Sequence, residues 1–310
     1  MMNIDTPVLK QEKFKSYKTM KLVSKILAYA LLVILAIIWL YPILWIVISS
    51  FTVDANGGSV GILSTYFPDG EKTFFGIDNY RYLFQSGYGG RIFFKEWFTT
   101  TLTIAVVSCI VSTAFTLMVA YVMSKLQFSF RKTYLNVALI IGLFPGFMSM
   151  VAIYYLLTAM GLTETKEAGM LALILCNCAG AGTGFYVAKG FFDVVPNSLM
   201  ESARLDGATN AQIFLHIILP MSKPIVIYQA LMAFTGPWMD FIFAKVILGP
   251  KPEFWTVSVG LYETMNATQL PKTVFSIAAA GCVCVAVPIV TLFMFLQKYY
   301  VEGVTAGSVK

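Results

Sequence analysis

The segment from Pro196 to Pro224 has the sequence PNSLMESARLDGATNAQIFLHIILPMSKP, a polar stretch in a largely apolar chain. Pro196 followed by Asn197 is a helix-start signal. Glu201 is expected in the first turn, where a carboxylate interacts favourably with the positive end of the helix dipole. Gly207 is expected to end the helix, because glycine adopts the left-handed conformation without steric cost. The segment therefore begins with a short helix that stops at a glycine turn.

A second helix is expected directly after this turn. Thr209 or Asn210 is suited to cap it, and Pro220 is expected to end it. Its apolar residues share one face: Ile213, Phe214, Ile217 and Ile218. Such a helix-turn-helix could rest on its own protein and offer three charged residues to a cytoplasmic partner: Glu201, Arg204 and Asp206. The alternative is a solvated connector, in which the first two of these only pair with each other.

The composition places the chain in a lipid bilayer. Of its 310 residues, 58% are hydrophobic and 12% are charged, and the mean hydropathy is +0.75. Soluble domains carry about 25% charged residues. A chain with so few charges is therefore expected to be a membrane protein.

Apolar stretches predict an all-α polytopic membrane protein with six transmembrane helices, at residues 26–48, 97–124, 133–160, 168–188, 224–248 and 273–296. The expected external loops are 52–96, 161–167 and 249–272. The expected cytoplasmic parts are an N-terminal tail (1–25), a turn (125–132), the polar loop 189–223 and a C-terminal tail (297–310). These parts hold 14 Lys/Arg and 6 Asp/Glu, and the rest of the chain holds 8 and 10. This bias predicts that both termini are cytoplasmic, and it excludes a nucleic-acid-binding groove.

No catalytic or metal-binding motif is present, so the chain is not expected to be an enzyme. The glycines at 180, 182 and 184 lack the Lys-Ser/Thr of a phosphate-binding loop, and their spacing favours close helix packing instead. All five cysteines lie in apolar stretches, and His216 is the only histidine. If ATP drives this protein, another chain must hydrolyse it.

Three residues in the apolar stretches are candidates for a transport pathway or gate. Asp240 lies within the fifth stretch, and an ionisable residue at such depth often serves transport. The alternative is that Asp240 reaches the outer interface beside Lys245. Pro237 and Pro145 mark possible kinks, which let helices bow around a cavity.

The polar segment resembles the coupling motif in membrane subunits of ATP-binding-cassette (ABC) importers, which is E-A-A, three residues, G, nine residues, I-x-L-P. Here Glu201-Ser202-Ala203 precedes Gly207, and Ile217-Ile218-Leu219-Pro220 follows nine residues later. Ser202 replaces the usual alanine, one small residue for another. The run FTGPWMDF at 234–241 and the ending GVTAGSVK at 303–310 resemble maltose/maltodextrin-type permeases, in particular the shorter of their two unlike permease subunits.

This resemblance implies a bacterial cell-membrane importer of oligosaccharides such as maltodextrin. Its implied partners are a second permease, an ATPase dimer that binds ATP and Mg, and an external binding protein. No cofactor is implied in this chain, and the main membrane sugar site is implied to lie in the second permease. The resemblance also assigns three sets of contacts. Residues for ATPase coupling are Glu201, Ser202, Ala203, Arg204, Asp206 and Gly207. Those of the ATPase-contacting tail are Gly303, Thr305, Ala306 and Gly307, and those of the binding-protein-contacting loop are Tyr262, Asn266 and Gln269.

Other functions remain open at this point. An importer of amino acids or osmolytes would share the polar segment, although the tail and the length argue against it. An ion-coupled secondary transporter would be expected to show charged residues at mid-span or inverted repeats, and neither is evident. A structural or enzyme-anchoring membrane protein is favoured only by the lack of catalytic residues.

Overall fold

The computed structural model describes residues 7–54, 67, 73–86, 90–180, 184–266 and 274–306, and side chains for these residues except 7–19, 54 and 299–306. The helices are α1 (Pro7–Phe51), α3 (Asp78–Phe84), α4 (Phe94–Lys125), α5 (Arg131–Gly142), α6 (Gly146–Ala159), α7 (Lys166–Ala179), α8 (Tyr186–Val194), α9 (Asn197–Leu205), α10 (Asn210–Ile213), α11 (Leu219–Met221), α12 (Lys223–Met239), α13 (Ile242–Leu248), α14 (Val257–Met265) and α15 (Val274–Ala306). The π-helix η2 (Phe214–Ile218) joins α10 to α11, and the 3-10 helix η3 (Pro252–Phe254) precedes α14. Strand β1 (Thr52–Asp54) pairs antiparallel with β2 (Thr73–Phe75).

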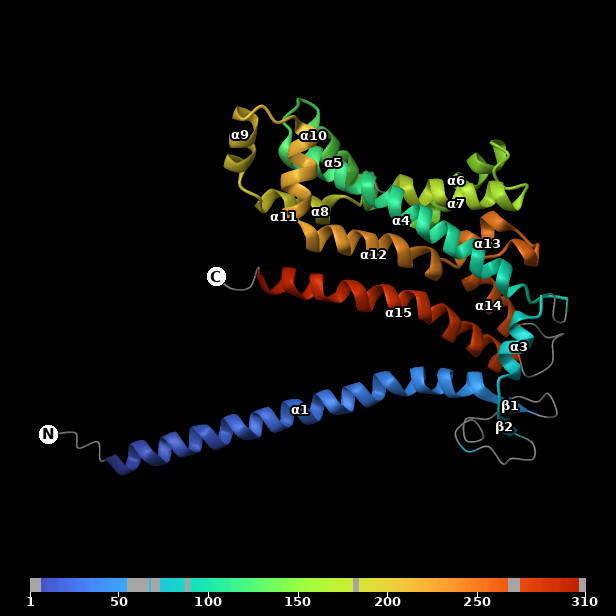
Figure 1. The fold of residues 1–310 in the computed structure, drawn as a ribbon, viewed down its shortest axis with the longest axis horizontal. Coiled ribbons are helices and arrows are strands. Elements are labelled where there is room, and N and C mark those ends of the chain that lie inside the picture. The colour runs from blue at the N-terminus through green and yellow to red at the C-terminus, as the bar shows by residue number, and fades with distance from the viewer. Residues whose placement is uncertain are drawn as a thin grey trace.

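Helix α4 lies at the centre of the fold, packed against α7, α8 and α12, while α15 lies between α12 and α1 (Figure 1). The segment α9–α11, the start of α1 and the end of α15 lie at one end of the molecule, and β1, β2, α3, α13 and α14 lie at the other. Trp97 of α4 anchors the latter end: its indole N–H donates to the Pro252 carbonyl at 2.6 Å, and its ring contacts that of Trp255.

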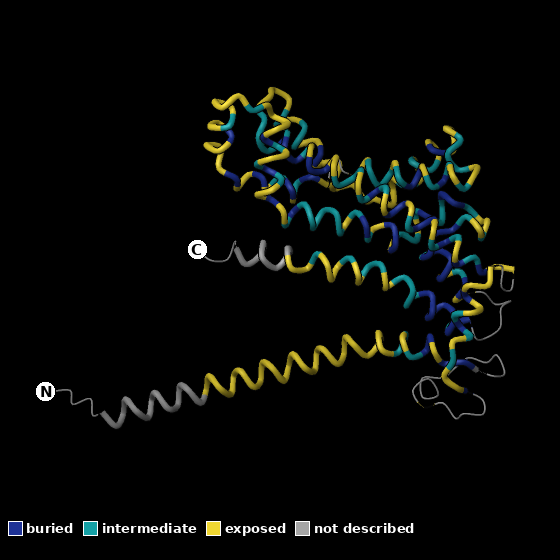
Figure 2. The backbone as a smooth tube through the Cα atoms, viewed as in Figure 1, coloured by how far each residue is buried: buried dark blue, intermediate teal, exposed yellow. Residues whose placement is uncertain are grey.

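From residue 20 to residue 44, helix α1 is largely apolar and exposed, as the yellow tube in Figure 2 shows. Trp39, for example, is 74% exposed. A helix with such a surface is suited to lipid or to another subunit, because its backbone polar groups are all satisfied internally.

The described residues contain three helical stretches long and apolar enough to cross a bilayer alone: Met20–Phe51, Phe94–Lys125 and Val274–Lys298. Two bent pairs also qualify, α5 with α6 at 98° and α10–α11 with α12 at 88°. The interruption expected in the stretch 133–160 is confirmed. Pro145 has no N–H and disfavours helical geometry in the residue before it, so α5 ends and α6 starts in a new direction.

Two other predicted crossings are not continuous helices. The stretch 168–188 is divided, because α7 ends at Ala179 and α8 begins at Tyr186. The stretch 224–248 is divided at Asp240, which has an extended backbone (ψ 109°). Pro237 lies inside α12 and does not end it.

The two long predicted loops and the C-terminal tail contain more regular structure than expected. The 52–96 region holds β1, β2 and α3, so the chain is not purely helical, and the 249–272 region holds η3 and α14. Helix α14 packs so closely on α4 that a Cβ built on Gly260 would lie 2.2 Å from the Trp97 ring. Val257, Val259 and Leu261 of α14 are buried, and the removal of these apolar side chains from water explains why this region is ordered as a helix. Helix α15 runs on to Ala306, into the predicted tail.

Candidate functional site

Helix α9 has the predicted limits but a different first turn. Pro196 has an extended backbone (ψ 133°) and lies outside the helix, so the first turn covers residues 197–200. Glu201 therefore lies in the second turn, and the prediction that it interacts with the N-terminal dipole is wrong. The Glu201 side chain is exposed and forms no ion pair with Arg204 in the described structure.

Gly207 forms the predicted turn after α9. Its φ is +84°, in the left-handed region. Its N–H donates to the Arg204 carbonyl at 3.0 Å, and the Ala208 N–H donates to the Ala203 carbonyl at 2.9 Å. These two bonds form a Schellman motif, which satisfies the last carbonyls of the helix.

Thr209, rather than Asn210, caps the second helix. Its hydroxyl accepts from the Gln212 N–H at 3.3 Å, and its own N–H donates to the Gln212 side chain at 2.8 Å, so both halves of a capping box are present. Pro220 does not end this helix, which continues to Met221. Pro220 lacks an N–H, and the π-helix η2 before it has wider hydrogen-bond spacing than an α-helix. The helix therefore passes through Pro220 and the chain bends at Ser222.

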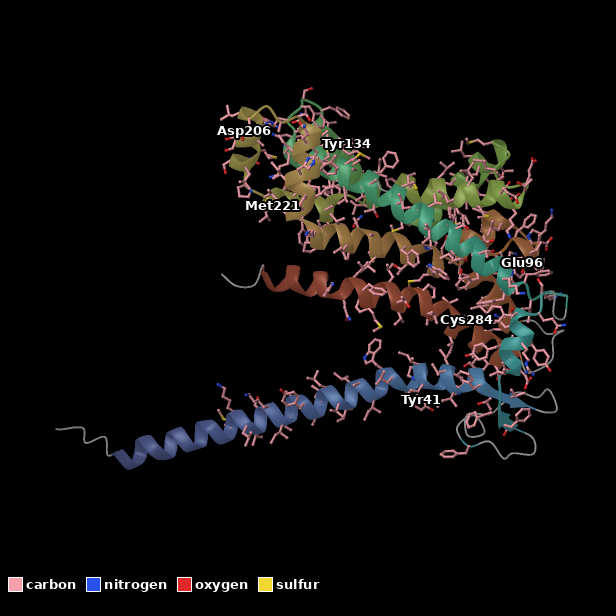
Figure 3. The ribbon with its side chains drawn as sticks, in the orientation of Figure 1. Tyr41, Glu96, Tyr134, Asp206, Met221 and Cys284 are labelled. Carbon is pink, nitrogen blue, oxygen red and sulfur yellow. The ribbon has the colours of Figure 1, made fainter. Side chains whose placement is uncertain are left out.

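One face of this helix pair is buried and the other is exposed. The buried face packs against α8 and the end of α4 in a cluster that contains Leu117, Tyr121, Phe185, Phe192, Met200, Ile213 and Ile218. The exposed face carries Glu201, Ser202, Arg204, Asp206 and Gly207, while Ala203 is half-buried. Figure 3 shows Asp206 at the end of the molecule remote from Glu96. Leu205 stands among these charged residues and is 90% exposed.

Polar contacts tie this segment to the end of α4. The Lys125 ammonium donates to the Val195 carbonyl at 2.6 Å and to the Asn197 side chain at 3.1 Å. The Tyr121 hydroxyl donates to the Asn210 carbonyl at 3.1 Å. Arg204 bonds the Asn210 side chain at 3.3 Å, which links α9 to α10. Displacement of α9 is therefore expected to be transmitted to α4.

Asp193 adds an ionic contact between α8 and α4. Its carboxylate accepts from Ser124 at 2.6 Å and pairs with Lys189 at 2.7 Å. Burial favours the neutral acid, but these hydrogen bonds and the charges of Lys189 and Lys125 outweigh it and lower the pKa of Asp193 below its usual 3.8. Asp193 therefore stays ionised at neutral pH and keeps this contact.

Two pockets flank the exposed face. A pocket of 520 Å³ is lined by Lys125, Asn197, Glu201 and Arg204, among others. A second, of 350 Å³, is lined by residues that include Asp206, Gln212 and His216. The helix pair therefore projects between two recesses, a shape suited to contact with another protein.

The three candidate gate residues have different surroundings. The Asp240 carboxylate accepts from the N–H groups of Phe243 at 3.2 Å and Ala244 at 3.5 Å, and so caps α13. It does not pair with Lys245, which forms an ion pair with Glu263 at 2.7 Å. Pro145 is exposed at the α5–α6 bend, whereas Pro237 is buried in α12.

The remaining candidates lie near the two ends of the molecule. Tyr262 is half exposed on α14, and its ring packs 4.4 Å from that of Phe241. Asn266 donates to the Tyr262 carbonyl at 2.8 Å, and Gln269 lies outside the described residues. Three of the tail residues, Gly303, Thr305 and Ala306, belong to α15, and Gly307 lies outside the described residues.

Sequence reasoning missed two residues of this site. Leu205 is an apolar residue between the charged residues Arg204 and Asp206, and this position in a polar segment could have indicated its role. Lys125 was recognised only as a positive charge after the second crossing, and no local pattern indicates that it reaches residues 195 and 197.

Comparison with known proteins identifies the family. A family model described as "Binding-protein-dependent transport system inner membrane component" matches residues 117–305. The galactooligosaccharides transport system permease protein GanQ of Bacillus subtilis is 32% identical over 294 residues, which cover 94% of this chain and 98% of GanQ. The maltodextrin transport system permease protein MalD of Streptococcus pneumoniae is 34% identical over 296 residues, which cover 95% of this chain and 99% of MalD.

A solved structure has a similar fold. A bacterial ABC transporter involved in the import of the acidic polysaccharide alginate contains a chain that matches with a TM-score of 0.73 at 20% identity, covering 90% of this chain and 96% of that one. The arrangement of helices is therefore shared with a chain of that transporter. The chain belongs to the family of binding-protein-dependent transport system inner membrane components, the membrane-embedded permease subunits of bacterial ABC importers.

Proposed function

We propose that this chain is one of two unlike permease subunits in an importer of neutral oligosaccharides, powered by a separate ATPase dimer and supplied by an external binding protein. The assignment of the substrate class rests on one observation. Almost the whole chain is similar to permeases named for galactooligosaccharides and maltodextrin, and both of these are built of uncharged sugars. None of the described residues that line the polar pocket between α4, α7 and α12 is Lys, Arg, Asp or Glu, which agrees with a neutral substrate.

The exposed face of α9 and the turn after it form the ATPase-docking surface. It combines an apolar side chain, Leu205, with charges of both signs on Glu201, Arg204 and Asp206. Burial of the Leu205 side chain against a partner would be favourable, because it removes apolar surface from water. Ala203 and Gly207 have structural roles here, since small residues at these positions allow the close turn.

The end of the molecule that holds α9 faces the cytoplasm, together with both termini. Two observations support this orientation: α9, the start of α1 and the end of α15 lie at the same end in Figure 1, and the predicted cytoplasmic parts carry the excess of Lys and Arg. In this orientation the chain crosses the bilayer six times, and the fourth crossing is broken between α7 and the start of α8, ending at residue 188. The Tyr262–Gln269 region faces the binding protein, and the tail at 303–307 contacts the ATPase.

Coupling operates by alternating access. ATP binding closes the ATPase dimer and displaces α9, which the polar contacts of Lys125 and Tyr121 connect to α4. Because α4 packs on α7, α8 and α12, its movement tilts the surrounding helices. The nucleotide thereby supplies the free-energy difference between inward-open and outward-open states.

Reconstitution of the whole importer tests this function. With the second permease, the ATPase and the binding protein in liposomes, the wild type should accumulate radiolabelled maltotriose or galactotriose only with ATP. Glu201→Lys should weaken ATPase association and abolish uptake, because it reverses a charge on the docking surface. Glu164→Lys is the matched control, since this exposed residue lies in the turn before α7, outside the docking surface. Uptake driven by an ion gradient without ATP, or equal behaviour of the two variants, would contradict the proposal.

A further inference from the structure

A polar pocket of 230 Å³ lies between α4, α7 and α12. Ser108, Ser112 and Thr116 line it from α4, and their four-residue spacing places them on one face of that helix. Asn177 contributes from the end of α7 and Gln229 from α12. The pocket therefore brings three hydroxyls and two carboxamides together near the middle of α4.

Several polar side chains of this pocket form no hydrogen bond with the residues that the structure describes. Ser108 is 1% exposed, and its hydroxyl forms no hydrogen bond in the described structure. The side chains of Ser112, Asn177 and Gln229 likewise form none with other described residues. A buried hydroxyl or amide without a partner costs about 1–3 kcal/mol, so such a cluster inside a membrane bundle is expected to have a ligand.

Gly180, directly after α7, and Gly184 also line the pocket. Gly236 of α12 lines the opposite side, and a Cβ built on it meets nothing within 4 Å. The space beside Gly236 is therefore open.

The chemistry of the lining selects the kind of ligand. No Lys, Arg, Asp or Glu is among the described residues that line the pocket, so a charged ligand would have no counter-ion there. Hydroxyls and carboxamides both donate and accept hydrogen bonds, which matches the hydroxyl groups of a sugar. The volume is below the ~300 Å³ of a complete small-molecule site, and this fits one sugar ring better than a whole oligosaccharide.

We propose that this pocket is a sugar-binding subsite within the chain itself, which holds one ring of the oligosaccharide as it crosses the membrane. This inference rests on the proposed oligosaccharide import. It extends what the family resemblance implies, which places the main membrane sugar site in the second permease.

The test measures two quantities on the reconstituted importer: uptake of radiolabelled maltotriose or galactotriose, and ATP hydrolysis stimulated by the binding protein. Asn177→Leu and Gln229→Leu keep side-chain size but remove the hydrogen bonds. Each should lower the sugar transported per ATP hydrolysed by at least about threefold, and the double variant by at least about tenfold, while hydrolysis is unchanged. Thr235→Val is the control on α12, because the Thr235 hydroxyl bonds the Leu231 carbonyl of its own helix.

Two further variants separate a binding role from a structural one. Gly236→Val should fill the pocket without a backbone clash and produce the same loss, and Ser112→Ala removes a single oxygen. If uptake and hydrolysis fall in parallel, or if the ratio is unchanged in Gly236→Val and Ser112→Ala, the subsite is refuted while the importer function stands. A wild-type complex that takes up neither sugar would refute the import proposal, and the subsite with it.

Discussion

Leu205 provides the sharpest test of the docking surface. Its side chain is 90% exposed, so nearly all its apolar area is available to a partner. Burial of a leucine side chain is worth about 1.5–3 kcal/mol, and alanine retains only part of it. Leu205→Ala should therefore weaken ATPase binding by about 2 kcal/mol, which corresponds to about thirtyfold in Kd.

The assay measures nucleotide-free ATPase binding to the permease pair in lipid nanodiscs by surface plasmon resonance. Leu215→Ala is the matched control, since Leu215 is 55% exposed on η2 and does not line either pocket beside the docking face. The Leu215→Ala variant makes the same leucine-to-alanine change at a position away from the α9 turn. A Leu205→Ala affinity within threefold of the wild type, or an equal loss in both variants, would refute the assignment of Leu205 as an anchor.

Three further predictions follow from the geometry of single residues. Gly207→Ala should reduce sugar uptake with normal membrane insertion, because φ of +84° costs a non-glycine residue about 1–2 kcal/mol, whereas Gly190→Ala in α8 should not. Lys125→Met should accelerate amide hydrogen exchange in α9, measured by mass spectrometry, because a charged hydrogen bond worth about 1.5–3 kcal/mol is lost; normal protection there would contradict the role of Lys125. Gly260→Ala should lower the thermal unfolding midpoint in detergent by overpacking worth about 1–3 kcal/mol, since its Cβ would lie 2.2 Å from the Trp97 ring; an unchanged midpoint would show that α14 has room to shift.

The local structure of the polar segment could be predicted because its signals are local. Gly207 and Thr209 fix the turn and the cap through their own backbone preferences and nearest neighbours. The break at Pro145 belongs to the same class, because a missing N–H acts within one turn of helix. The π-helix η2 before Pro220 could not be predicted, because it depends on how this helix packs against the rest of the protein.

The sequence by itself determined that this chain belongs in a membrane, where a polar helix-turn-helix lies, and which family motif it carries, because composition and short-range backbone preferences are properties of the chain alone. Only the tertiary structure decided that Asp240 caps a new helix, that Lys125 holds the segment before α9, and that Ser112, Asn177 and Gln229 line one pocket. These contacts join residues from different helices or depend on where a helix breaks. Their formation depends on the packing of the whole bundle, which no local pattern specifies.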